Sequence, residues 1–184
     1  MKRRQALQLS GTLAFAVVSG CLGSDDELAT DGTDDDPIDA DVETLLLTED
    51  AIADILGGGW TESEPEAESL VRDADAATGF IPYDGEEFHD AGTVTTAAYS
   101  FDDVDPAREE FDDHPYQNGW GFEEREIAVE SIAGTVDQND ARVVFREANA
   151  MGAVSYKYSD ESEDELEATA LELAVSMHEA WRTD

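Results

Sequence analysis

Positive charge is scarce in this sequence. Only 10 of the 184 residues are Lys or Arg, against 46 Asp and Glu, and the formal net charge is −36. Lysine occurs only at Lys2 and Lys157. Proteins that bind nucleic acid through its phosphates need a basic patch that displaces counterions. This chain has no such patch, so we expect no nucleic-acid partner.

Recognisable catalytic and metal-binding motifs are also missing. Residues 178–181 (HEAW) begin like the zinc motif H-E-x-x-H, but Arg182 stands where the second His belongs. There is no G-x-S-x-G elbow, phosphate loop or dinucleotide fingerprint. Residues 73–79 depart from an EF-hand loop at Ala77 and Thr78. We therefore expect no catalytic residue, metal or cofactor, and we interpret the many paired carboxylates as solvated surface.

The chain has one cysteine, Cys21, which excludes an internal disulfide. Lys2, Arg3 and Arg4 precede an uncharged stretch, which ends with small residues just before Cys21. This layout is typical of a secretory signal, and the apolar run is too short for a transmembrane helix. No activating base or further metal ligand accompanies the thiol, so a role as nucleophile or ligand is disfavoured.

Two features of this segment match known export signals. The Arg3-Arg4 pair resembles a twin-arginine signal, although no Ser or Thr precedes it. Residues 18–21 (VSGC) resemble the lipoprotein processing box. The resemblance implies that residues 1–20 are a signal peptide removed before Cys21 and that the thiol carries a lipid. The mature protein would then be anchored to the outer face of the cell membrane.

The acidic residues continue through the segments that look folded. A low-lysine, acid-covered surface of this kind resembles proteins of extremely halophilic archaea. Strong self-repulsion at low ionic strength would be relieved in concentrated salt, where the Debye length is about 3 Å at ~1 M. Residues 21–42 are rich in Asp, Gly and Thr, with scattered apolar residues. We interpret them as a lipidated cysteine followed by a flexible acidic tether.

Residues 43–184 are expected to form one globular domain, with helices marked by their caps. Thr48 is a good N-cap for a helix that ends at Gly57. Asp105, with Pro106 at the first helical position, opens a second helix. The last helix begins with the capping box of Ser162 and Glu165. Its apolar side chains then recur on one face: Leu166, Ala170, Leu173, Ala174, Met177 and Trp181.

Strands are expected between these helices. Residues 93–101 alternate as a strand, with Thr95, Ala97, Tyr99 and Phe101 on one face. Residues 117–129 read as a turn and then a strand, and 131–136 as another strand. The segments 141–148 and 152–159 flank a turn at 149–152. Residues 72–92 are long for a structureless loop, so they are functional, flexible or contain a short element.

This order predicts an α+β domain: a mainly antiparallel sheet packed by a long C-terminal amphipathic helix and shorter helices. The pattern across 43–182, with a strand–helix pair, a hairpin around 149–154 and a long final helix, is similar to PsbP-like domains. It is also similar to sensor-type domains of mycobacterial lipoproteins and receptor kinases. Those domains often carry paired cysteines, which this chain lacks.

Aromatic residues in glycine-containing loops are the candidate binding residues. They occur in segments 79–89 and 116–122: Phe80, Tyr83, His89, Tyr116, Trp120 and Phe122. The alternative is that these rings cover the core. We expect surface or capping roles for His89 and His114, and a helix C-terminal position near the dipole for His178.

The sequence therefore favours a non-enzymatic, salt-adapted domain that binds a protein partner or a small ligand outside the cytoplasm. Two alternatives stay open. One is an extracytoplasmic hydrolase or metal-dependent enzyme, and the other is an accessory subunit of a membrane transport or cell-envelope complex.

Overall fold

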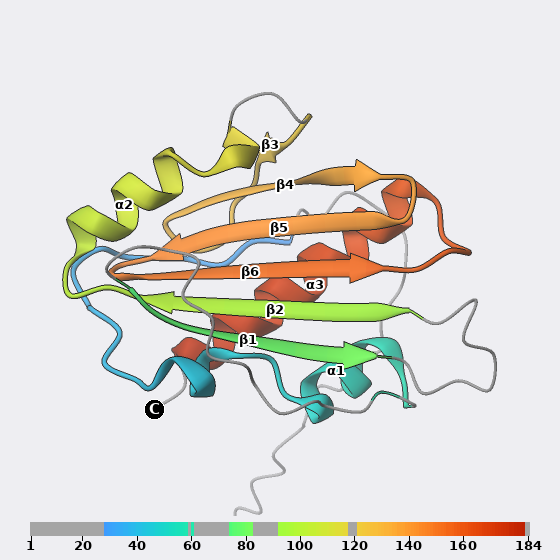
Figure 1. Cartoon of the computed structure of the whole chain (residues 1–184), viewed down its shortest axis with the longest axis horizontal. Helices are drawn as coiled ribbons and strands as arrows, with labels where there is room; N and C mark the ends of the chain where they lie inside the picture. The colour runs from blue at the N-terminus through green and yellow to red at the C-terminus, as the bar shows by residue number, and fades with distance from the viewer. Residues whose placement is uncertain (1–27, 59, 61–73, 83–91, 118–120, 183–184) are drawn as a thin grey trace, which may run out of the picture.

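The computed structural model describes residues 28–58, 60, 74–82, 92–117 and 121–182. Its centre is a six-stranded sheet with the strand order β1-β2-β6-β5-β4-β3 (Figure 1). All the neighbouring strands that pair in this sheet are antiparallel. The fold class predicted from the sequence, an α+β domain with an antiparallel sheet, is confirmed.

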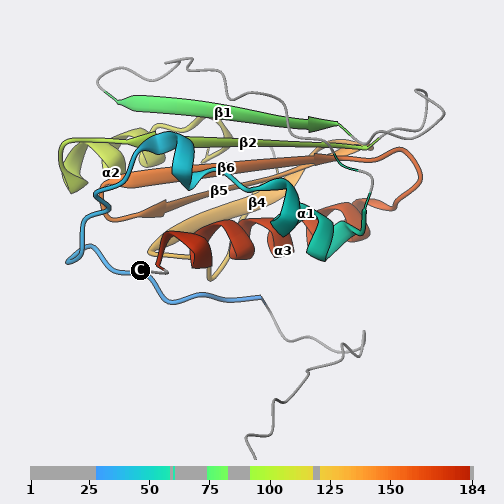
Figure 2. The ribbon, with the colours of Figure 1, turned by 90° about the horizontal axis from the view of Figure 1, so that it is seen from below.

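The long C-terminal helix α3 (Glu163–Trp181) covers one face of this sheet, which we call the helix face (Figure 2). Its predicted capping box is present, with the Ser162 side chain accepting from the Glu165 N–H and Glu165 bonding back to the Ser162 N–H. The predicted stripe from Leu166 to Met177 is fully buried. The contact between this stripe and the sheet belongs to the larger of the two hydrophobic clusters among the described residues.

The N-terminal elements cover the rest of the helix face. The 3₁₀ helix η1 (Val42–Leu45) contacts β1 and β2, and helix α1 (Glu49–Leu56) packs beside α3. The Thr48 side chain caps α1 by accepting from the Ala51 N–H at 3.2 Å, and α1 ends before Gly57, as predicted. Trp181 donates from Nε1 to the Leu45 carbonyl at 2.7 Å, which joins the two ends of the domain.

The opposite face of the sheet, which we call the second face, carries helix α2 (Val104–Asp112) and the short turn η2 (Pro115–Gln117). Ala107 and Phe111 of α2 are buried against this face, as their spacing predicted. The helix begins at Val104, so Pro106 is its third residue and not its first. The prediction was wrong there because Pro fits the whole first turn, where N–H groups have no helical partner.

The strands β4 (Glu130–Asp137), β5 (Asp140–Glu147) and β6 (Ala150–Lys157) form the predicted meander. The β5–β6 turn consists of Ala148 and Asn149 alone, and Gly152 lies inside β6 opposite Phe145. The predicted turn at 149–152 was therefore placed too late. A Cβ at Gly152 would come within 2.3 Å of the Phe145 ring, so glycine is required there by packing and not by a turn.

The sheet's outer strands differ more from expectation. Residues 75–82 form a full strand, β1 (Asp75–Pro82), paired with β2 (Thr93–Ser100) along its length. The strand expected within 117–129 is reduced to β3 (Glu123–Glu124). Ala128 has a φ of 57°, which is incompatible with a continuing strand.

Part of the segment interpreted as a flexible tether lies against the domain. Thr30 donates its N–H to the Glu126 carbonyl at 2.8 Å, and the Ile38 N–H donates to Asn149 Oδ1 at 2.7 Å. We call residues 30–38 the strap. The prediction of a tether through residue 42 rested on composition, whereas the strap is held by partners distant in the sequence. Within the described residues, no helix is both long and apolar enough to cross a membrane.

Candidate functional site

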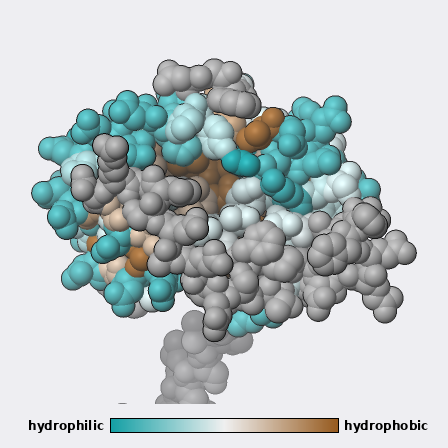
Figure 3. Space-filling model, in the orientation of Figure 1, coloured by the Kyte–Doolittle hydropathy of each residue, from teal (hydrophilic) through white to brown (hydrophobic). Residues whose placement is uncertain are grey.

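The second face carries a pocket with a volume of about 370 Å³. Its floor is made of small side chains that the register places side by side, with Ala97 of β2 beside Ala153 of β6 and Ala153 beside Val144 of β5. Because these side chains are short, the sheet is hollowed where α2 and η2 do not cover it. Figure 3 shows hydrophobic surface at the base of a hollow in the middle of this face, with hydrophilic residues around it.

Tyr116 in η2 forms one wall of the pocket. Its ring stacks on Phe122, with 4.5 Å between the ring centroids and 9° between the ring planes. The Arg142 guanidinium lies 5.5 Å from the centroid of the Tyr116 ring and donates to the Tyr116 hydroxyl. This stack fixes the tyrosine ring in place at the pocket's edge.

The polar groups around the pocket other than Arg142 are neutral. His114 is half-buried, and its burial, followed by the nearby Arg142 charge, lowers the pKa of its imidazole. Burial raises the pKa of Tyr99, which is another lining residue. At neutral pH both side chains are therefore uncharged, and Thr78 and Thr95 add hydroxyl groups to the lining.

Arg142, the one cation in the lining, is already neutralised. Its guanidinium pairs with Asp140 at 2.7 Å, and Asp140 also accepts from Ser155 at 2.8 Å and pairs with Lys157 at 3.2 Å. Burial alone would raise the pKa of Asp140, but the hydrogen bonds from Arg142 and Ser155 outweigh it and the pKa is lowered. The carboxylate is thus charged and cancels the arginine.

The same pairing holds for every Lys and Arg in the part of the chain that the structure describes. Each makes an ion pair with at least one carboxylate: Arg108, Arg125, Arg142, Arg146, Lys157 and Arg182. The described surface therefore offers no uncompensated cation to an anionic ligand.

The pocket includes some of the residues singled out in the sequence. Tyr116 lines it, and Phe122 supports Tyr116 from behind. Phe80 lies in β1, of which only the backbone is described at that position. Tyr83, His89 and Trp120 fall outside the described residues, as do Cys21 and the export-signal residues Arg3 and Arg4.

Sequence reasoning missed the floor and the cation of this pocket. Ala97, Ala153 and Arg142 carry no motif, and their common feature is that they project from the same face of neighbouring strands. The small residues that alternate along 93–101 could be seen in the sequence, but the strand that pairs with this segment could not be identified from it.

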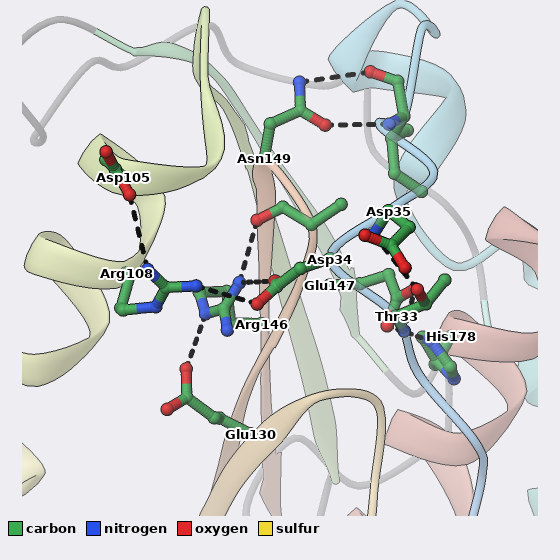
Figure 4. Close-up of polar contacts among 12 residues, drawn as sticks. Thr33, Asp34, Asp35, Asp105, Arg108, Glu130, Arg146, Glu147, Asn149 and His178 are labelled. Carbon is green, nitrogen blue, oxygen red and sulfur yellow. Dashed lines mark hydrogen bonds and ion pairs between the residues drawn. The ribbon is translucent and has the colours of Figure 1, made fainter.

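A second polar cluster joins the strap to the β5–β6 turn (Figure 4). Arg146 of β5 is 1% exposed, and it pairs with Asp34 of the strap and with Glu130 of β4, each at 2.6 Å. Asp34 also pairs with Arg108 of α2 at 2.8 Å. One strap carboxylate therefore bridges two arginines, one from strand β5 and one from helix α2.

His178 lies in the last turn of α3, near the helix C-terminus as predicted, and it is buried there. It is 1% exposed, with Nε2 3.3 Å from Oε2 of Glu147, and burial lowers the pKa of its imidazole. Glu147 is itself fully buried, pairs with Arg182 and accepts the Thr33 N–H at 3.0 Å. Glu147 and Asp140 are thus buried single carboxylates with basic partners, which the interpretation of paired carboxylates as solvated surface does not cover.

The buried pair of Glu147 and His178 is shielded from solvent on both sides, so we assign it a structural role. Among the residues that the structure describes, no cluster of three or more His, Cys, Asp or Glu side chains is placed to hold a metal ion.

This fold has a solved counterpart. The chain is similar to the extracellular domain of PknH from Mycobacterium tuberculosis, with a TM-score of 0.54 and 12% sequence identity. The match covers 81% of this chain and 99% of that domain. At this identity the likeness shows a shared fold, in line with the resemblance to mycobacterial receptor-kinase sensor domains seen in the sequence. No family model and no curated protein matches the chain.

Proposed function

We propose that this protein is a lipid-anchored, extracytoplasmic binding domain that takes up a small, neutral and largely apolar ligand in the pocket on the second face. The proposal makes the domain non-enzymatic and adapted to concentrated salt. The observation that carries it is the pocket itself: a hollow floored by alanines, walled by a fixed aromatic ring and lined by polar groups of which only Arg142, paired with Asp140, is charged.

The volume and chemistry of the pocket support the class of ligand. Small-molecule sites are mostly apolar hollows of roughly 300–1,000 Å³ with a few polar groups that orient the ligand. This pocket lies within that range, and its hydroxyl groups and imidazole can orient a neutral molecule. An anion would meet the intact pair of Arg142 and Asp140 in a strongly acidic protein, which disfavours it.

The proposed location rests on the N-terminal segment. The basic start, the apolar stretch and the VSGC sequence ending at Cys21 together support export, cleavage before the cysteine and lipidation. The structural neighbour is described as an extracellular domain, which supports placing this domain outside the cytoplasm as well.

Two dyes that differ only in charge test the ligand class. N-phenyl-1-naphthylamine is neutral, and 8-anilino-1-naphthalenesulfonate has the same rings with a sulfonate added. The full chain carrying Cys21→Ser, purified in molar KCl without detergent, is titrated with each dye and the fluorescence is recorded. We expect saturable enhancement with the neutral dye and a weaker response with the anionic dye.

Substitutions in the pocket locate the binding. Ala97→Leu and Ala153→Leu fill the floor and are expected to abolish saturable binding of the neutral dye. Ala168→Leu, on the exposed side of α3, is the matched control and leaves binding unchanged. Equal binding by all three variants, or stronger binding of the sulfonate, would reject this pocket as the site of a neutral ligand.

The anchor is tested by fractionation. The unsubstituted protein is expected in the membrane fraction and the Cys21→Ser protein in the soluble fraction. A Cys21→Ser protein that stays fully membrane-bound would contradict lipidation of the cysteine.

A further inference from the structure

The strap lies so close to the domain that one of its positions accepts only glycine. A Cβ built on Gly32 would lie 2.2 Å from the Ala128 carbonyl carbon, 2.3 Å from the Val129 nitrogen and 2.3 Å from Glu147 Oε2. Two of these three contacts are with backbone, which cannot move aside as a flexible side chain can. The docked position of the strap therefore requires glycine at residue 32.

Buried groups of the domain also depend on the strap. Without it, Arg146 would lose Asp34 and Glu147 would lose the Thr33 N–H, although both side chains are at most 1% exposed. Arg146 would keep only Glu130, and Glu147 would keep only Arg182 and His178, so each buried charge would lose a partner at a cost in free energy. Asn149 binds the strap at its other end, accepting the Ile38 N–H and donating to the Ile38 carbonyl. The strap is thus part of the folded domain along its length.

The N-terminal end of the strap meets the domain on the helix face, whereas Asp34 in its middle reaches Arg108 of α2 on the second face. The Thr30 hydroxyl accepts the Ala128 N–H at 3.0 Å, and Ala128 packs against the core beneath α3. The neighbouring Ile127 is buried in the same core. The pocket lies on the opposite face, over Ala97 and Ala153. The chain therefore enters the domain from the helix face.

We propose that the docked strap orients the domain on the membrane, with the helix face toward the bilayer and the pocket face turned outward. This inference rests on the proposed anchoring at Cys21. Eight residues lie between Cys21 and Thr30, and the nine residue-to-residue steps span at most about 30 Å. A free tether up to Glu43 would span about 75 Å and allow any orientation. The short link and its point of attachment together keep the pocket accessible from outside.

Energy transfer to the membrane surface tests the orientation. A donor dye is attached at Ala168→Cys on α3, or at Glu109→Cys on α2, in lipidated full-chain protein in which Cys21 is blocked by its lipid. The protein is placed in phosphatidylcholine vesicles with a headgroup acceptor. Transfer from position 168 is expected to exceed transfer from position 109.

Gly32→Ala is expected to remove this difference, whereas Gly58→Ala, at an exposed glycine with open space around it, preserves it. Equal transfer from the two positions in the parent protein would overturn the proposed orientation.

Hydrogen exchange tests the docking independently of the membrane. In the soluble Cys21→Ser protein, the Thr33 and Ile38 amides are expected to be protected, and Gly32→Ala is expected to abolish that protection while Gly58→Ala keeps it. If Gly32→Ala does not fold, Asp34→Asn serves as the second variant, with loss of protection expected at Thr33. Unprotected amides in the parent overturn the docked strap. A parent protein that fails to bind vesicles, yet keeps protected amides, overturns the anchoring and the orientation but not the docking.

Discussion

Shortening Leu173 tests the packing of α3 on the sheet. The Leu173 side chain is 0% exposed and lies at the middle of the buried stripe, with strands β5 and β6 beneath the helix. Leu→Ala at such a site removes apolar contacts and leaves a cavity, which costs about 3–4 kcal/mol. Domains of this kind are stable by only about 5–15 kcal/mol, so the effect is a large share of the total.

The assay is urea unfolding in molar KCl, because urea carries no charge and leaves the ionic strength unchanged. Glu172→Ala is the matched control: it is the neighbouring residue, exposed on the other side of the helix, and should change stability by less than about 0.5 kcal/mol. Leu173→Asp would bury an unpaired carboxylate and is expected to unfold the domain. A loss below about 1 kcal/mol for Leu173→Ala would refute the packing described for α3.

Three further outcomes are expected. The hydrogen bond from Arg146 lowers the pKa of Asp34 against a smaller opposing effect of burial. The stability that the ionised Asp34 contributes is therefore present above its ordinary pKa of about 3.9 and is lost as the pH falls through the lowered pKa. The difference in urea midpoint between the parent and Asp34→Asn should shrink on acidification, and a difference that grows would contradict this expectation. Ala148 has a φ of 47°, so Ala148→Gly should raise stability by about 1 kcal/mol in the same assay, and a clear loss would show that its methyl contact matters more than its backbone. With a net charge of −36, the free energy of unfolding should rise with KCl concentration and level off at molar salt; stability independent of KCl would reject the salt adaptation.

The helices could be predicted because their signals are local. The cap at Thr48 and the capping box at Ser162 act within one turn, and the apolar stripe of α3 follows the helical period. Strand β1 carries no such signal: Ala76, Ala77 and Gly79 have low β-propensity, and the strand exists because β2 pairs with it throughout.

The strap and the pocket were beyond prediction for a related reason. Asp34 pairs with Arg146 across 112 residues of sequence and with Arg108 across 74. In the sequence alone, an acidic residue among acidic residues is indistinguishable from solvated surface. The pocket floor likewise depends on the register that places Ala97 beside Ala153. Tyr116 and Phe122 could be singled out because aromatic rings near glycines stand out in any sequence.

The strand order determines when each strand can find its neighbours during synthesis. β1 and β2 form early in the chain, but β2 acquires its inner neighbour only when β6 has been made. The strap acquires part of its binding site even later, because Arg182, which pairs with Asp36 of the strap, follows the end of α3. The first half of the chain must therefore remain without its partners until nearly the whole polypeptide has left the ribosome. A chain truncated before β6 would leave the inner edge of β2 open to other strands, and we expect such a fragment to aggregate.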